Sequence, residues 1–117
     1  MAHKIMVCGS RTINDENLIF SKLDECLMKY PDMILVSGGA KGVDSIGEKW
    51  AKNNHVFIEQ HKPEWDKYGR GAGIVRNKTM VEVSSHVLIF WDGVSKGTKS
   101  DIDFCRKLNK PFSLYRV

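Results

Sequence analysis

The chain has 117 residues, which is room for one domain spanning residues 1–117. Hydrophobic residues make up 42% and charged residues 27%, as in globular proteins that bury a core without a disulfide or metal staple. The formal net charge of +4 favours an anionic partner, but it does not identify the chemical class of that partner. No apolar run approaches the length of about 18 residues needed to span a membrane, and no signal-peptide cleavage pattern follows the start.

The three cysteines, Cys8, Cys26 and Cys105, are widely spaced and odd in number. They form no CxxC pair and no Cys/His spacing of a metal site, so neither a metal nor a cofactor is expected. We interpret them as reduced thiols in or near the core of a cytoplasmic protein.

Strands and helices alternate along the chain, as judged from apolar runs, helical apolar spacing, and capping or breaking residues. The first helix is expected to be capped by Asn14 or Asp15 and to end at Pro31. The predicted order is strand 3–8, helix to 30, strand 33–36, helix 43–53, strand 55–59, irregular segment 62–73, helix 74–83, strand 86–91, helix 99–108 and strand 111–115.

This alternation predicts the α/β class. We expect a single Rossmann-like, doubly wound domain with a five-stranded, mainly parallel sheet and helices on both faces. Ligands of such sheets bind outside the carboxyl ends of the strands, near the point where the strand order reverses. The loops at residues 9–11, 37–44 and 93–98 follow predicted strands and should meet at that edge.

The loop at residues 37–44 joins a strand to a helix start. Its glycines allow a tight turn, and the free N–H groups of the helix start favour a phosphate or carboxylate. The spacing matches neither a Walker A loop nor a dinucleotide GxGxxG motif, and turn geometry alone is an equal alternative. The candidate binding residues here are Ser37, Gly38, Gly39, Ala40, Lys41, Gly42 and Asp44.

The other two loops add further candidates at the same edge. Thr98 could cap the following helix or bond a phosphate oxygen, beside Gly97 and the cation Lys96. Gly9 and Ser10 precede Arg11, which could clamp a phosphate through two nitrogen atoms. Two polar glycine loops at one sheet edge favour a shared anion site over two unrelated turns.

Four residues in the irregular segment after the third strand and at the start of the next helix are weaker candidates. Arg76 and Asn77 lie near a helix start, where a solvated surface arginine is the common alternative. Trp65 and Tyr68 could each stack on a base, although core packing is the more common role for Trp65.

The aspartates at positions 101 and 103 are two apart, so they face different sides of a helix and form no acid–base pair.

Taken together in this order, these motifs resemble the YspA/cpYpsA-related SLOG family over nearly the whole chain. The motifs are residues 7–11, residues 37–44, Trp65 with Tyr68 and Gly69, Arg76 and Asn77 with Met80, and Gly97 with Thr98. The resemblance implies a compact Rossmann-like domain that binds nucleotides or nucleotide-derived ligands. The wider superfamily includes LOG phosphoribohydrolases, the DNA-processing DprA domain and sensor domains for ADP-ribose-like signals.

The LOG enzymes carry an arginine before the fourth strand and a PGGxGTxxE loop with a catalytic glutamate. Arg76 matches that arginine, and Lys96-Gly97-Thr98 matches the loop in part. Asp101 stands where the glutamate would be, but its side chain is one methylene shorter. Because catalytic groups tolerate little misplacement, the binding role carries over better than the hydrolase role.

We therefore expect a protein that senses or sequesters a nucleotide-derived small molecule, such as an ADP-ribose-like signalling nucleotide, without catalysis. Phosphates would lie on the loops at residues 38–42 and 96–98. Arg11, Arg76 and Asn77 would contact phosphate or ribose, Asp44 or Asp101 the ribose hydroxyls, and Trp65 or Tyr68 the base.

Two alternatives stay open. One is a LOG-like hydrolase that cleaves an N-glycosidic bond, with Asp101 and Arg76 as catalytic residues. The other is DprA-like binding of nucleic acid, a partner that we do not expect because no helix-turn-helix or RNA-binding motif accompanies the basic residues. A homo-oligomer is expected, because related domains self-associate and a chain this short offers few walls for a deep pocket.

Overall fold

The computed structural model describes residues 2–117 and contains a five-stranded sheet in which every strand pairing is parallel. The spatial order is β3-β2-β1-β4-β5. The predicted doubly wound α/β fold is therefore confirmed, and the sheet is wholly rather than mainly parallel. The strands are β1 Lys4–Gly9, β2 Ile34–Ser37, β3 Ile58–Gln60, β4 His86–Trp91 and β5 Phe112–Arg116.

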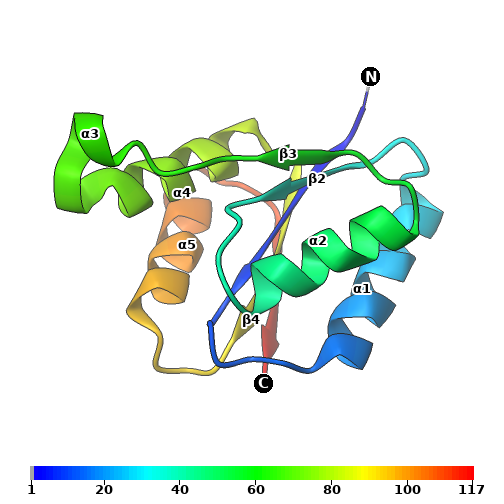
Figure 1. Ribbon diagram of the computed structural model, residues 1–117. Helices are drawn as coiled ribbons and strands as arrows, with labels where there is room; N and C mark the ends of the chain where they lie inside the picture. The colour runs from blue at the N-terminus through cyan, green and yellow to red at the C-terminus, as the bar shows by residue number, and fades with distance from the viewer. Residues whose placement is uncertain (1) are drawn as a thin grey trace.

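Two helices cover each face of the sheet (Figure 1). Helices α1 (Glu16–Lys29) and α2 (Val43–Asn53) pack on one face, and α4 (Ala72–Val83) and α5 (Lys96–Lys107) on the other. The strand order steps outward from β1 to β3 and then returns to β4 on the other side of β1. Because such crossovers are right-handed, that reversal sends the later helices to the opposite face. It also opens a crevice between the carboxyl ends of β1 and β4.

Strand β1 shows why the strands appear in the sequence as unbroken apolar runs. Ile5 and Val7 pack towards α1 and α2, whereas Met6 and Cys8 pack towards α4 and α5, and all four are buried. Burying an aliphatic side chain of this size stabilises the fold by about 1.5–3 kcal/mol. The buried central strand β1 therefore fixes the position at which the following loop begins.

Two predicted boundaries need correction. Helix α5 begins at Lys96 rather than at residue 99, so Thr98 lies in its first turn and is not its N-cap. The preceding loop is short because Asp92 Oδ1 accepts the N–H groups of Val94 and Ser95, at 2.9 and 2.8 Å. Strand β3 begins at Ile58 rather than at residue 55, since His55 has a φ of 55°, outside the extended region.

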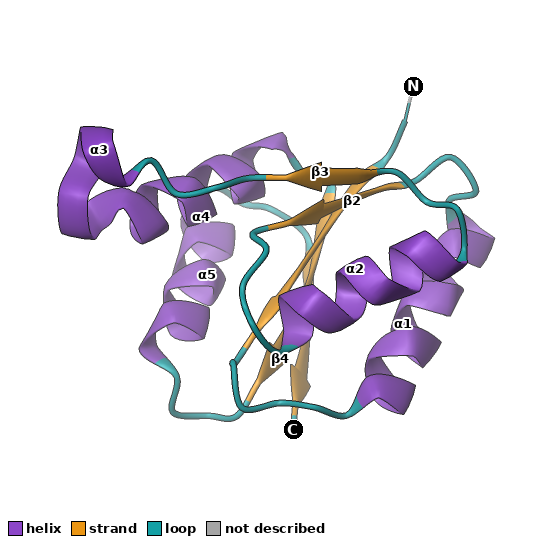
Figure 2. Cartoon of the chain, in the orientation of Figure 1, coloured by secondary structure: helices purple, strands orange, loops and turns teal. Residues whose placement is uncertain are grey.

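The segment at residues 62–73, predicted to be irregular, is largely helical (Figure 2). It holds the short helix α3 (Trp65–Tyr68), a 3₁₀ turn η1 (Gly69–Gly71) and the start of α4. Trp65 is 59% exposed, so it does not pack in the core. The short turns have no buried side chain of their own, which is why apolar spacing did not reveal them.

The remaining fold-level observations concern membranes and cysteines. Within residues 2–117, no helix is both long and apolar enough to cross a membrane. All three cysteines are free thiols, and Cys8 and Cys105 are buried as expected. The cytoplasmic location stays a prediction.

Candidate functional site

A pocket of about 360 Å³ lies at the carboxyl ends of β1 and β4, between the starts of α2 and α5 and the side of α4. We call it the first pocket. It occupies the crevice that the reversal of strand order creates. Its lining residues are Cys8, Gly9, Ser10, Arg11, Thr12, Ala40, Asp44, Arg76, Asn77, Met80, Asp92, Ser95, Gly97, Thr98 and Asp101.

The glycine-rich loop after β2 serves the first pocket mainly by close packing. A Cβ atom on Gly38 would lie 2.6 Å from Arg76 Nη1 and 3.1 Å from Asp44 Oδ2, so a larger residue there would push the Arg76 guanidinium aside. Two N–H groups of the loop are already bound internally, since Gly39 N donates to Ser37 Oγ and Ala40 N to Asp44 Oδ2. The loop therefore positions charged side chains more than it offers free donors.

Arg76 reaches the first pocket from α4. Its Nη1 donates to the carbonyl of Gly38 at 2.8 Å, and its Nε donates to Asn77 Oδ1 at 2.8 Å. Arg11 enters from the loop after β1 and is exposed. Within residues 2–117, neither arginine has a carboxylate within 4 Å, so both positive charges are available to an anionic ligand.

Two buried carboxyl groups face these cations. Burial raises the pKa of Asp44 to about 6, against the opposing effects of the Ala40 N–H and the Arg76 guanidinium. Burial also raises the pKa of Asp101 to about 7; the Cys8 thiol and Arg76 oppose this rise, whereas Asp44 adds to it. Asp101 Oδ1 is buried and has no hydrogen-bond partner within residues 2–117. The floor of the pocket can therefore donate as well as accept protons near neutral pH.

The start of α5 supplies a further polar wall. Gly97 and Thr98 lie in its first turn, where the N–H groups have no partner within the helix. Ser95 Oγ and Thr98 Oγ1 are 3.2 Å apart and hold the turn together. A helix N-terminus favours negative charge, so a phosphate is the group that this wall suits best.

The structure brings many of the expected site residues together in the first pocket. The pocket is lined by the expected residues of the loop after β1. It is also lined by Ala40, Asp44, Arg76, Asn77, Gly97, Thr98 and Asp101. Ser37 instead donates to Glu48 Oε2 at 2.7 Å. The expected residues outside its lining are Ser37, Gly38, Gly39, Lys41, Gly42, Trp65, Tyr68 and Lys96.

Sequence reasoning missed several lining residues. Cys8 and Thr12 flank the expected loop after β1, and Ser95 precedes α5. Asp92 is the clearest omission, because it receives the Thr12 hydroxyl at 3.3 Å and the two N–H groups of its own turn. An aspartate directly after a buried strand and before a glycine is typical of such a turn, and this signal could have identified it.

The first pocket combines cationic, hydrogen-bond-donating and acidic groups. Within residues 2–117, no group of three or more His, Cys, Asp or Glu side chains could hold a metal ion. Unpaired guanidinium groups, a helix N-terminus and buried carboxyl groups together define a Rossmann-like domain with a polar pocket at its switch point.

The chain belongs to the YspA, cpYpsA-related SLOG family, whose model matches residues 3–68. It is also 31% identical over 115 residues to the Gene 61 protein of Mycobacterium phage D29, with 92% of each chain covered. The resemblance drawn from the sequence motifs is thus confirmed.

Two solved structures of DNA processing protein A share the fold. The protein from Helicobacter pylori, described for its single-stranded DNA binding mode, has a TM-score of 0.73 and 23% identity over 96% of this chain and 64% of that one. The Streptococcus pneumoniae protein has a TM-score of 0.60 and 15% identity over 97% of this chain and 59% of that one. The chain thus spans about three fifths of each neighbour.

These neighbours correct one expectation. We did not expect a nucleic-acid partner, because no DNA-binding motif was found. That expectation is wrong in the light of neighbours that process DNA, one of them known for binding single strands. The Rossmann-like fold itself accompanies DNA binding there, so a missing helix-turn-helix motif carries no weight. The expected homo-oligomer is not addressed by a single chain.

Proposed function

We propose that the first pocket binds a phosphorylated nucleoside. The phosphate would lie against the N-terminal turn of α5, between Arg11 and Arg76. The ribose hydroxyls would donate to Asp44 or Asp101, which lie deeper. Carboxylates bind ribose hydroxyls in this way in Rossmann-type sites.

One observation supports this assignment above the others. Two arginines that form no ion pair within residues 2–117 line the same pocket as two buried carboxyl groups. Arginine binds phosphate through paired nitrogen atoms, which suits it to this role. The raised pKa of Asp44 and of Asp101 leaves part of these groups uncharged near neutral pH, so the carboxyl groups repel an anionic ligand less than their number suggests.

The same chemistry could come from two sources. One is a free nucleotide-derived small molecule, such as an ADP-ribose-like compound that the protein senses or sequesters. The other is a nucleotide within a single strand of DNA, which the likeness to DNA processing protein A supports. Both present a phosphate and a pentose to the first pocket.

Isothermal titration calorimetry with AMP, ADP-ribose and a single-stranded oligodeoxynucleotide tests this function. Arg76→Gln should weaken binding at least tenfold, because hydrogen bonds to charged groups contribute about 1.5–3 kcal/mol. Arg106→Gln is the matched control, since Arg106 is exposed in the last turn of α5. A steep fall of affinity with salt would identify the strand as the source. If none of the three ligands binds at millimolar concentration, the proposed function is wrong.

Cleavage of an N-glycosidic bond is a second candidate, supported by the raised pKa of Asp101. A carboxylic acid that is half protonated near pH 7 is suited to general acid catalysis. Asp101 would give its proton to the leaving base, and water would add its hydroxyl to the anomeric carbon and return a proton to Asp101. Chromatography of nucleotide mixtures incubated with the protein and with Asp101→Asn tests this step. Release of free base by the native protein alone supports it, and release by neither protein rejects it.

A further inference from the structure

A second pocket of about 270 Å³ lies beside the first, on the other side of α4. We call it the second pocket. It opens between the segment after β3, the short helix α3 and α4. The lining residues used below are His61, Lys62, Glu64, Tyr68, Arg76 and Thr79.

Helix α4 divides the two pockets, and Arg76 belongs to both. Asn77 and Met80 line the first pocket, whereas Thr79 lines the second. Arg76 Nη1 is 2.8 Å from the Gly38 carbonyl on one side and 3.5 Å from the carbonyl of His61 on the other. The guanidinium therefore stands between the pockets, where it can meet a phosphate that joins their contents.

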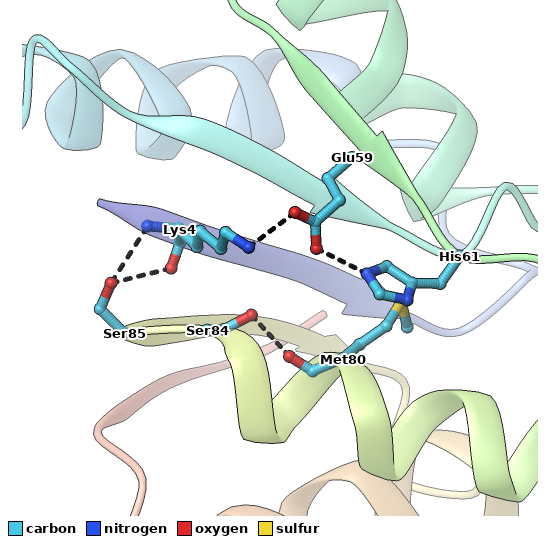
Figure 3. Close-up of polar contacts among 6 residues, drawn as sticks. All are labelled: Lys4, Glu59, His61, Met80, Ser84 and Ser85. Carbon is cyan, nitrogen blue, oxygen red and sulfur yellow. Dashed lines mark hydrogen bonds and ion pairs between the residues drawn. The ribbon is translucent and has the colours of Figure 1, made fainter. Parts of the chain in front are cut away.

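The wall that carries His61 is held by a chain of contacts from Lys4 through Glu59 to His61 (Figure 3). Lys4 Nζ is 2.8 Å from Glu59 Oε1, and Glu59 Oε2 is 2.7 Å from His61 Nε2. The contacts with Lys4 and then His61 lower the pKa of Glu59, so its carboxylate stays charged. A wall held in place by these contacts needs little rearrangement to accept a ligand.

The other walls combine an aromatic ring, a cation, the carboxylate of Glu64, and small polar and apolar groups. Tyr68 is 40% exposed and offers a ring on which a base can stack. Lys62 is exposed and forms no ion pair within residues 2–117. Thr79 Oγ1 donates to Val75 O at 3.1 Å, which leaves its oxygen free to accept. This set suits a nucleoside with a neighbouring phosphate and not an apolar chain.

The size of the pockets supports the same assignment. Ligand pockets commonly have volumes of about 300–1,000 Å³. The first pocket, at about 360 Å³, lies at the small end of that range, and the second, at about 270 Å³, lies just below it. Each alone suits one small unit, whereas the two together suit a ligand of two units.

We propose that the second pocket binds a second nucleoside, so that the protein recognises two nucleosides joined through phosphate, with the linking phosphate at Arg76. This inference rests on the proposed function, because the first nucleoside occupies the first pocket. Two sources share this chemistry: a free dinucleoside diphosphate and two successive nucleotides of a single strand.

Calorimetric affinities for AMP, the dinucleoside diphosphate NAD and the phosphorylated dinucleotide pApA test the inference. At least one two-nucleoside ligand should bind about tenfold or more tightly than AMP, as expected for one added base–aromatic stack. Whichever of the two binds better identifies the source. Tyr68→Ala should remove this gain and leave AMP binding unchanged. Trp65→Ala is the matched control, because Trp65 is an exposed aromatic of the same short helix that lines neither pocket.

A second variant guards against an indirect effect of Tyr68→Ala. Thr79→Trp would fill the second pocket from α4 and should remove the same gain. If AMP binds but neither two-nucleoside ligand binds more tightly, the second pocket is not a nucleoside site and the proposed function stands. Equal weakening of AMP and of the two-nucleoside ligands by Tyr68→Ala would also overturn the inference. If no ligand binds, both proposals fall together.

Discussion

Replacing the buried carboxyl group of Asp101 by an amide should stabilise the protein, and more so at high pH. Asp101→Asn keeps the shape of the side chain and removes its charge. Asp44 on α2, Arg76 on α4 and Cys8 on β1 surround the group. Burial is the main cause of its raised pKa, so ionisation of Asp101 costs more in the folded state than in the unfolded state.

The pH window follows from the two pKa values. The carboxyl group ionises near pH 3.8 in the unfolded chain and near pH 7 in the folded protein. Between these values the unfolded state loses its proton first, so the free energy of unfolding falls by up to about 1.4 kcal/mol per pH unit as pH rises. Above pH 7 both states are ionised and the loss levels off. From pH 5 to pH 8 the loss is therefore about 2–3 kcal/mol, and Asp101→Asn should not suffer it.

Urea unfolding of both proteins at pH 5 and at pH 8 measures this difference. The stabilising effect of Asp101→Asn should be larger at pH 8 by about 2–3 kcal/mol. Asp103→Asn is the matched control: Asp103 lies on the same helix with its side chain 56% exposed, and its change should be within about 0.5 kcal/mol at both pH values. An effect of Asp101→Asn that is the same at pH 5 and pH 8 would refute the reasoning, because the folded carboxyl group would then titrate normally.

Three further predictions follow from the site. Gly38→Ala should weaken AMP binding and change the free energy of unfolding by no more than about 1 kcal/mol, because its Cβ would displace the flexible end of Arg76; calorimetry and urea unfolding measure the two effects. Affinity for NAD, whose phosphates do not titrate between pH 6 and pH 8, should rise as pH falls through this range while Asp44 and Asp101 take up protons; affinity constant over the range would contradict this. Cys8 should resist alkylation at pH 8 until urea unfolds the chain, because burial raises its pKa and hides its sulfur; mass spectrometry of the labelled peptide detects the change.

Much of the fold could be predicted because the strands of a parallel sheet are buried on both faces. Such strands appear in the sequence as continuous apolar runs. Residues 86–91 form an apolar run whose limits are those of β4. Helix α2 was predicted with both its limits, because its apolar face repeats at helical spacing after Gly42. The start of α5 was missed because it depends on a side chain, Asp92, that bonds to its own turn. Hydrophobic spacing carries no information about such a bond.

The candidate site was predictable in place but not in detail. Topology alone brings the loops after β1, β2 and β4 to one edge, so Arg11 and Gly97 could be expected near each other. The contact of Arg76 with the Gly38 carbonyl joins residues 38 positions apart, and only tertiary packing determines it. The sequence spacing correctly separated Asp101 from Asp103, yet the burial that raises the pKa of Asp101 depends on three other elements.

The position of Arg76 between the two pockets has a thermodynamic consequence. A guanidinium that contacts the contents of both pockets cannot respond to one without altering the other. Any group that draws Arg76 away from the Gly38 carbonyl changes the geometry offered on the far side of α4. Linkage makes such an effect reciprocal, so each pocket changes the affinity of the other by the same factor. If both pockets bind as proposed, Arg76 would therefore couple their affinities.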